Sequence, residues 1–121
     1  MLDWLAYRKE ITGRIGQFAK LSPGTVQGYQ ALSKAGAATG HLDARTRELI
    51  ALAVSVTTRC DGCITVHTAE ALKHGATKDE IAEALGVAVA LNAGAAMVYS
   101  ARTLDAVDAY TANANPAPAP A

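Results

Sequence analysis

The stretch Arg59-Cys-Asp-Gly-Cys-Ile-Thr-Val-His67 holds both cysteines of the chain, three residues apart, and a histidine four residues after the second. If the stretch is helical, a rotation of about 100° per residue brings Cys60, Cys63 and His67 within an arc of roughly 60°. Thiols at a helix N-terminus are reactive because the unpaired amides stabilise a thiolate. The stretch therefore predicts a dithiol at the start of a helix, with a histidine one turn further on.

The surrounding sequence is helical in pattern throughout. Apolar residues recur at helical spacing, and no segment alternates with a period of two. Helix boundaries are marked by Ser22-Pro23, by a capping Asp43, by Lys73-His74-Gly75 and by a capping box from Thr77 to Glu80. We therefore expect an all-α bundle of about six helices. Their approximate ranges are 3–19, 23–38, 44–57, 60–74, 78–91 and 95–112, with a break at Asn92-Ala-Gly94.

The length of 121 residues predicts one compact domain, over residues 1–112. Residues 113–121 alternate proline and alanine without charge, which predicts an extended, disordered tail. The segment 78–91 is apolar around most of its circumference, more than a small monomer easily hides, so we expect a homo-oligomer.

Charge and composition exclude several classes of partner. Eleven basic and eleven acidic residues cancel, so the electrostatic footprint of a nucleic-acid binder is absent and no anionic membrane surface is implied. The uncharged run 84–101 is interrupted by polar residues and rich in alanine, which favours buried helices of a soluble protein over a membrane span. No export signal is visible, so we expect a cytoplasmic protein. In that compartment a close cysteine pair is more often catalytic or metal-binding than structural.

Glu48 is the candidate partner for His67. It lies in a strongly apolar segment and shares a helical face with Leu52 and Ser55, where a carboxylate needs a hydrogen-bonding or charged neighbour. Glu48 orienting His67, and His67 deprotonating Cys63, would form a relay of nucleophile, base and orienting acid. Alternatively, Glu48 is solvated near the first turn of its helix, where acids favour the dipole.

Other interpretations of the cysteine pair remain open. The two thiols could be inert core residues, or Cys60, Cys63, His67 and Glu48 could hold zinc, although no second close Cys/His pair exists to complete a typical structural site. A thioredoxin fold is not indicated, because its motif follows a strand and no strand pattern is present. The scattered tryptophan and tyrosines fit a packing role.

The sequence resembles the AhpD-like alkylhydroperoxidases of the carboxymuconolactone decarboxylase superfamily. The matching pattern is Glu48, eleven residues, Cys60-Asp-Gly-Cys63, three residues and His67, continued by Thr-Ala-Glu-Ala-Leu-Lys-His-Gly-Ala-Thr-Lys-Asp-Glu-Ile-Ala-Glu-Ala at 68–84. The similarity runs from about 42 to 109. It implies an all-helical fold and homo-oligomers, often trimers or hexamers.

The resemblance also implies a thiol peroxidase that needs no tightly bound cofactor and no metal. The position of Cys63 would attack a hydroperoxide, that of Cys60 would resolve the sulfenic acid to a disulfide, and Glu48 with His67 would relay the proton. An external dithiol, lipoamide-like or thioredoxin-like, would restore both thiols. Gly62 stands where well-studied members carry a second histidine. A redox-sensing or zinc-binding module and a decarboxylase-type enzyme are the alternatives.

Overall fold

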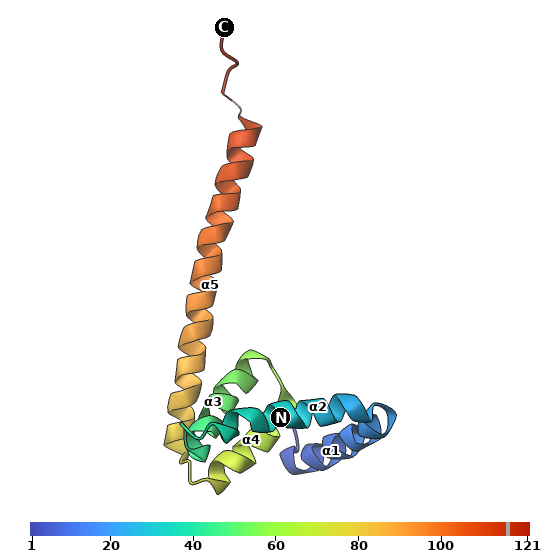
Figure 1. The fold of residues 1–121 in the computed structure, drawn as a ribbon. Coiled ribbons are helices and arrows are strands. Elements are labelled where there is room, and N and C mark those ends of the chain that lie inside the picture. The colour runs from blue at the N-terminus through green and yellow to red at the C-terminus, as the bar shows by residue number, and fades with distance from the viewer. Residues whose placement is uncertain (116) are drawn as a thin grey trace. The chain divides into compact units, whose positions relative to one another are not determined.

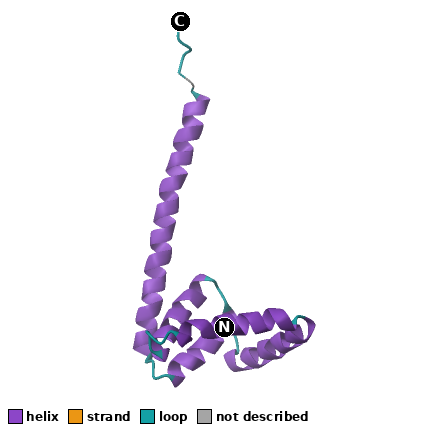
Figure 2. Ribbon diagram, in the orientation of Figure 1, coloured by secondary structure: helices purple, strands orange, loops and turns teal. Residues whose placement is uncertain are grey.

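The computed structural model describes residues 1–115 and 117–121, and all regular structure within them is helical (Figures 1 and 2). The expected all-α class is confirmed. Five helices follow one another along the described chain: α1 (Trp4–Leu21), α2 (Pro23–Ala38), α3 (Ala44–Thr57), α4 (Asp61–Lys73) and α5 (Lys78–Ala114).

The predicted cap residues set the helix boundaries. Asp43 precedes α3, and its Oδ1 accepts the amide of Thr46 at 2.8 Å. Hydrogen bonds from the side chain and backbone of Thr46 hold the pKa of Asp43 below its usual range. Gly75 ends α4 at φ +86°, and the Glu80 amide donates to Thr77 Oγ1 at 3.1 Å ahead of α5. The Glu80 carboxylate accepts the Thr77 hydroxyl at 3.4 Å, in place of the backbone amide that a full capping box uses.

The predicted sixth helix is wrong, because α5 continues through Asn92-Ala-Gly94 without a break. A glycine inside a helix costs only about 1 kcal/mol relative to alanine, and the residues next to the segment include Leu91, Ala95, Ala96 and Met97, which are strong helix formers. No proline interrupts the segment. The weak local signal at Asn92 and Gly94 is therefore outweighed by the propensity of its neighbours.

By contacts within the chain, the described residues form two compact units, Met1–Ala88 and Val89–Ala121, and the single domain expected from the length stays a prediction. The first unit holds α1 to α4 and the start of α5. Its α1 and α2 lie side by side, and α3 packs on α4 (Figure 1). The boundary expected between a domain ending at 112 and a tail stays a prediction, and α5 extends to Ala114.

The core of the first unit is small. Leu52 on α3, Ala71 on α4 and Ala76 after it form one buried cluster, and Leu49 and Ile81 pack against it. Ala71 is completely buried. Because this cluster joins α3, α4 and the start of α5, it fixes the two helices on which the predicted site residues lie.

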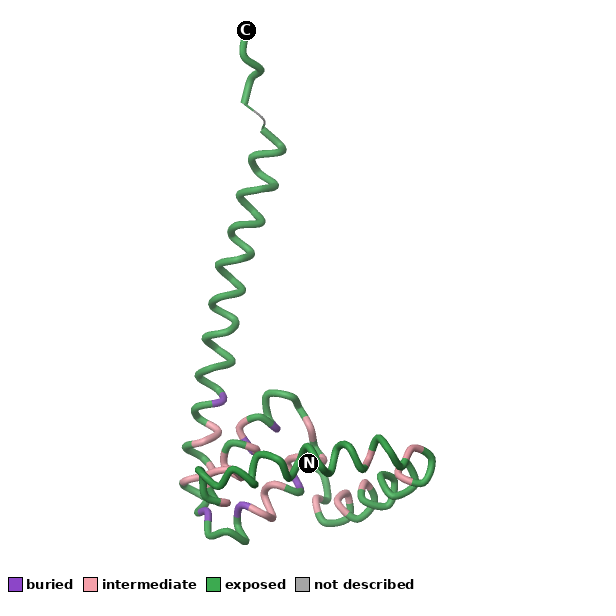
Figure 3. The backbone as a smooth tube through the Cα atoms, viewed as in Figure 1, coloured by how far each residue is buried: buried purple, intermediate pink, exposed green. Residues whose placement is uncertain are grey.

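The second unit has no core of its own in the isolated chain. Every described residue from Val89 onward is exposed, as Figure 3 shows in green along α5. The segment 84–101 was expected to be buried, and in the single chain most of its side chains are not. Residues 117–121 are exposed and without helix, and Pro116 of the expected tail lies outside the described residues. By length and composition alone, α5 also passes the test for a membrane-spanning helix, as core helices of soluble proteins do.

Candidate active site

The two cysteines lie at the N-terminus of α4, as the sequence predicts. Cys60 is the N-cap residue and Cys63 lies in the first turn, and the two form a disulfide with a Cα–Cα distance of 5.2 Å. The amide of Cys63 donates to the sulfur of Cys60 at 3.1 Å. The Cys60 sulfur thus fills the place of a capping oxygen, where unpaired helix amides favour negative charge.

A tight turn brings the cysteines back against α3. Thr58 closes α3, and Arg59 then adopts φ +54°, in the left-handed region that glycine usually occupies after a helix. The amide of Cys60 donates to the carbonyl of Ser55 at 3.1 Å. This bond ties the start of α4 to the last turns of α3, so both helices run alongside each other from the cysteine pair onward.

Glu48 and His67 meet across the contact between α3 and α4. His67 Nδ1 lies 2.6 Å from Glu48 Oε2, and the side chains are 30% and 19% exposed, respectively. Glu48 is one turn before the buried Leu52, on the face that also carries buried Ser55. The interpretation of Glu48 as a solvated residue of the first turn does not describe this geometry, because the carboxylate is mostly covered and hydrogen-bonded.

The contact with Glu48 determines which ring nitrogen of His67 is available for proton transfer. An ionised carboxylate only accepts hydrogen bonds, so Nδ1 carries the hydrogen that Glu48 receives. The other nitrogen, Nε2, is then left to take up or release a proton, because the ring is already oriented by its first bond. Glu48 and His67 therefore have the geometry of an orienting acid and a base.

A cavity of about 380 Å³ adjoins the disulfide and is shared by α1, α2 and α4. Helix α4 contributes the cysteines and His67, and α1 and α2 contribute mainly apolar and aromatic side chains. Its lining residues are Tyr7, Ile11, Thr12, Ile15, Tyr29, Cys60, Asp61, Gly62, Cys63, Val66 and His67. The cavity is thus lined by polar and redox-active side chains near the start of α4 and by mainly apolar side chains from α1 and α2.

The residues that line this cavity from α1 and α2 were not identified from the sequence as part of the site. Tyr7 and Tyr29 were assigned to packing, since they are far from the cysteines in the chain and stand in no motif with them. The approach of Tyr7 depends on α1 folding across α4, where the hydroxyl of buried Thr65 donates to the carbonyl of Trp4 at 3.4 Å, and Tyr29 lies on α2, which packs on α1. Only the long-range packing of α1, which local spacing does not report, would have revealed them.

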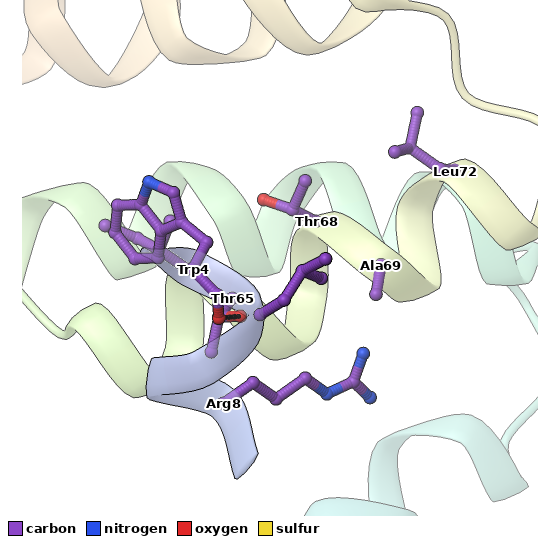
Figure 4. Close-up of a pocket in the computed structure, with 8 residues that line it drawn as sticks. Trp4, Arg8, Thr65, Thr68, Ala69 and Leu72 are labelled. Carbon is purple, nitrogen blue, oxygen red and sulfur yellow. Dashed lines mark hydrogen bonds between the residues drawn. The ribbon is translucent and has the colours of Figure 1, made fainter. Parts of the chain in front are cut away.

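A second cavity, also of about 380 Å³, lies between α1 and α4 on another face of α4 (Figure 4). Trp4 and Arg8 line it from α1, and Thr68 and Leu72 line it from α4. None of the residues predicted for the site lies in this cavity.

The remaining histidines stand apart from the cysteine pair. His74 caps the end of α4, and its Nε2 lies 3.7 Å from Glu70 Oε2. His41 is exposed between α2 and α3. Within residues 1–115 and 117–121, no three His, Cys, Asp or Glu side chains gather as a metal-binding group. In the disulfide form the two sulfurs are bonded to each other, so the four ligands considered for zinc do not form a zinc site in this state.

The fold and site define an all-helical protein with a redox-capable Cys-x-x-Cys beside a His–Glu pair. Residues 23–106 match the model of the carboxymuconolactone decarboxylase family, and the chain belongs to that family, within the AhpD-like superfamily. An uncharacterised protein of Haemophilus influenzae is 50% identical over 104 residues, covering 86% of this chain and 92% of that protein.

Two solved structures agree with the fold. The apo form of a carboxymuconolactone decarboxylase family protein from Legionella pneumophila superposes with a TM-score of 0.69 at 36% identity, covering 88% of this chain and 96% of that one. A protein from Methanobacterium thermoautotrophicum has a TM-score of 0.66 at 36% identity, over 71% and 97% of the two chains. The helical architecture is therefore that of the family.

Proposed function

We propose that the protein is a thiol-dependent peroxidase that reduces hydroperoxides through a Cys60–Cys63 dithiol/disulfide cycle. The observation that carries the proposal is the disulfide at the N-terminus of α4, in one pocket with His67, which Glu48 holds at 2.6 Å. The family also includes decarboxylases, but a close redox-active cysteine pair has its direct use in thiol chemistry.

The reaction has two steps. His67 takes the proton of Cys63, and the Cys63 thiolate attacks the terminal oxygen of the hydroperoxide, which forms a sulfenic acid and releases an alcohol. The Cys60 thiol then attacks the sulfenic sulfur, which releases water and forms the disulfide. An external dithiol, lipoamide-like or thioredoxin-like, reduces the disulfide and is itself oxidised, so the electrons balance.

The assignment of Cys60 as the resolving thiol follows the family resemblance. The amide of Cys63, which donates to the Cys60 sulfur at 3.1 Å, supports a thiolate on Cys60, and that thiolate suits attack on the sulfenic acid. The same bond would also support Cys60 as the thiol that attacks peroxide. Single serine substitutions separate the two assignments.

The test uses intact mass and free-thiol count on reduced, metal-free protein with one equivalent of hydroperoxide. Rapid loss of both thiols, a fall of about 2 Da and reversal by dihydrolipoamide are expected. Cys60→Ser should stop at a sulfenic acid on Cys63, and Cys63→Ser should react slowly. Sulfenic acid in Cys63→Ser alone would reverse the two roles. Unchanged thiols in the wild type would refute the peroxidase, and stoichiometric zinc lost in Cys60→Ser would identify a metal-binding module instead.

We further propose a cytoplasmic homo-oligomer, a trimer or hexamer. The support for association is the exposed apolar surface of the second unit, which includes Leu91, Met97 and Val98. A solvent-exposed helix of this composition is unfavourable in water, and contact with further copies would cover it. Neither nucleic acid nor a membrane is proposed as a partner.

A further inference from the structure

Cleavage of a hydroperoxide leaves an alkoxide, and the pocket must supply it with a proton or a hydrogen bond. This question rests on the proposed peroxidase reaction. His67 is assigned to remove the thiol proton, with Nδ1 bonded to Glu48. The protonated ring is then a competing donor to the alkoxide, and an unchanged rate without the phenol of Tyr7 would assign the protonation to His67. Asp61 contributes a carboxylate, which accepts hydrogen bonds when ionised and so does not serve as the donor. The remaining O–H donors of the cavity are the two tyrosines and Thr12.

Tyr7 is the best positioned of these donors. It lines the same cavity as both cysteines and His67, and its side chain is half-buried. Its ring meets the ring of Trp4 edge to face, with the centroids 6.3 Å apart and the planes at 88°. Such a pairing stabilises one orientation of the Tyr7 ring.

Helix α1 is in turn attached to α4 close to the site. The Trp4 carbonyl accepts the hydroxyl of Thr65, two residues after Cys63, and Figure 4 shows the Trp4 and Thr65 side chains together. The element that carries Tyr7 is therefore fixed to the helix that carries the cysteines. The reach of the phenol to the pocket does not depend on a mobile terminus.

The Tyr7 hydroxyl is also uncommitted. It makes no hydrogen bond to any other residue in the described part of the chain. Tyr29 lines the same cavity but is 65% exposed and has no ring partner among the described residues, and Thr12 is exposed as well. A phenol is moreover a stronger acid than the hydroxyl of threonine, and it is also a stronger acid than the alcohol product.

We propose that Tyr7 is the catalytic acid that protonates the leaving oxygen of the hydroperoxide. As the cysteine sulfur bonds to the terminal oxygen, the O–O bond breaks and its electron pair goes to the alkoxide. The Tyr7 O–H gives its proton to that alkoxide, which leaves as the alcohol. The phenolate then regains the proton that His67 took from Cys63, so the sum is thiol plus hydroperoxide giving sulfenic acid plus alcohol.

The test compares two oxidants whose leaving groups differ in basicity. Tert-butyl hydroperoxide releases an alkoxide, which needs a proton, and peracetic acid releases a carboxylate, which does not. Thiol loss of reduced full-length protein is followed by rapid quenching with an alkylating reagent and by mass. Tyr7→Phe keeps the ring that packs on Trp4, and Tyr110→Phe, at an exposed position of α5 that does not line the cavity, is the matched control.

Tyr7→Phe should slow oxidation by tert-butyl hydroperoxide by about tenfold to a hundredfold, at the lower end of general acid catalysis, because water can replace part of the phenol's function. Its rate with peracetic acid should change less than about twofold, and Tyr110→Phe should match the wild type with both oxidants.

If Tyr7→Phe slowed thiol oxidation equally with both oxidants, Tyr7 would have only a packing role and the proposal would be overturned. An unchanged oxidation rate of Tyr7→Phe with tert-butyl hydroperoxide would overturn it as well. In either case a reactive wild type leaves the peroxidase function standing. A wild type that neither oxidant converts would refute the peroxidase reaction and the role of Tyr7 with it.

Discussion

The two units of the chain solve the problem of apolar surface differently. The first, Met1–Ala88, buries a small apolar cluster around Ala71, and the carboxylate of Glu48 in this unit pairs with His67. The second, Val89–Ala121, buries none of its described residues in the isolated chain. The first unit, which carries the site, is therefore organised by contacts within the chain, whereas the second unit leaves its apolar side chains uncovered within the chain, and the proposed association with further copies would cover them.

The largest expected effect is on the second unit. Leu91 and Val98 are 66% and 62% exposed and stand seven residues apart, hence on one face of α5. If association buries that face, the double variant Leu91→Glu with Val98→Glu places two carboxylates in an apolar contact, which costs about 2 kcal/mol or more for each. Light scattering at micromolar concentration should show a multimer for the wild type and a monomer for the variant.

The matched control is Thr111→Glu with Asn113→Glu, which adds the same two charges at exposed polar positions of the same helix. It should keep the wild-type mass. A monomeric wild type would remove the contrast between the units, because the second unit would then be stable with its apolar side chains in water. A multimeric double variant would show that another face is the one in contact.

The next largest effect is expected on the rate of thiol oxidation, from a change at the Glu48–His67 pair of the first unit, on which the proposed proton relay depends. Glu48→Gln keeps the shape of the side chain but removes its charge, so the amide no longer stabilises a protonated His67 or selects one tautomer. The rate of thiol oxidation by hydroperoxide should fall by roughly tenfold to a hundredfold, in the range for loss of an orienting neighbour. Rapid-quench thiol counts measure it.

Glu80→Gln is the control for this prediction. Glu80 is a carboxylate of the same unit that pairs with Arg45 at 3.4 Å near the surface, away from the cysteine pocket. Its substitution should leave the oxidation rate unchanged. Equal rates for wild type and Glu48→Gln, with the helical signal retained, would mean that His67 works without its carboxylate.

Local chemistry explains which parts of the fold could be predicted. The caps at Asp43 and Thr77 and the left-handed Gly75 are decided by residues within one turn of each boundary, so sequence alone locates α3, α4 and the start of α5. The break expected at Gly94 is absent because a lone glycine is a weak signal against a strongly helix-forming background. Burial of the second unit by further copies stays a prediction, because apolarity indicates that a surface is covered but does not specify what covers it.

The site residues also differ in whether local sequence predicts their proximity. Cys60, Cys63 and His67 share one helical face, so their proximity follows from spacing, and the contact between His67 and Glu48 requires only that two consecutive helices pack. Tyr7 enters the pocket from α1, more than fifty residues before the cysteines in the chain. No spacing rule reports such a contact, because it depends on how α1 crosses α4.

The smallest effect concerns the turn that leads into the site. Arg59 adopts φ +54°, a left-handed conformation in which a side chain crowds the following carbonyl, and Gly75 occupies the same region at φ +86° after α4. Arg59→Gly relieves that crowding but makes the unfolded chain more flexible, so a net gain of about 0.5 kcal/mol in the free energy of unfolding is expected. Gly75→Ala introduces the crowding and should cost about 1 kcal/mol. Urea unfolding at one protein concentration measures both, and a loss of stability in Arg59→Gly would mean that the arginine side chain contributes more to the turn than its backbone conformation costs.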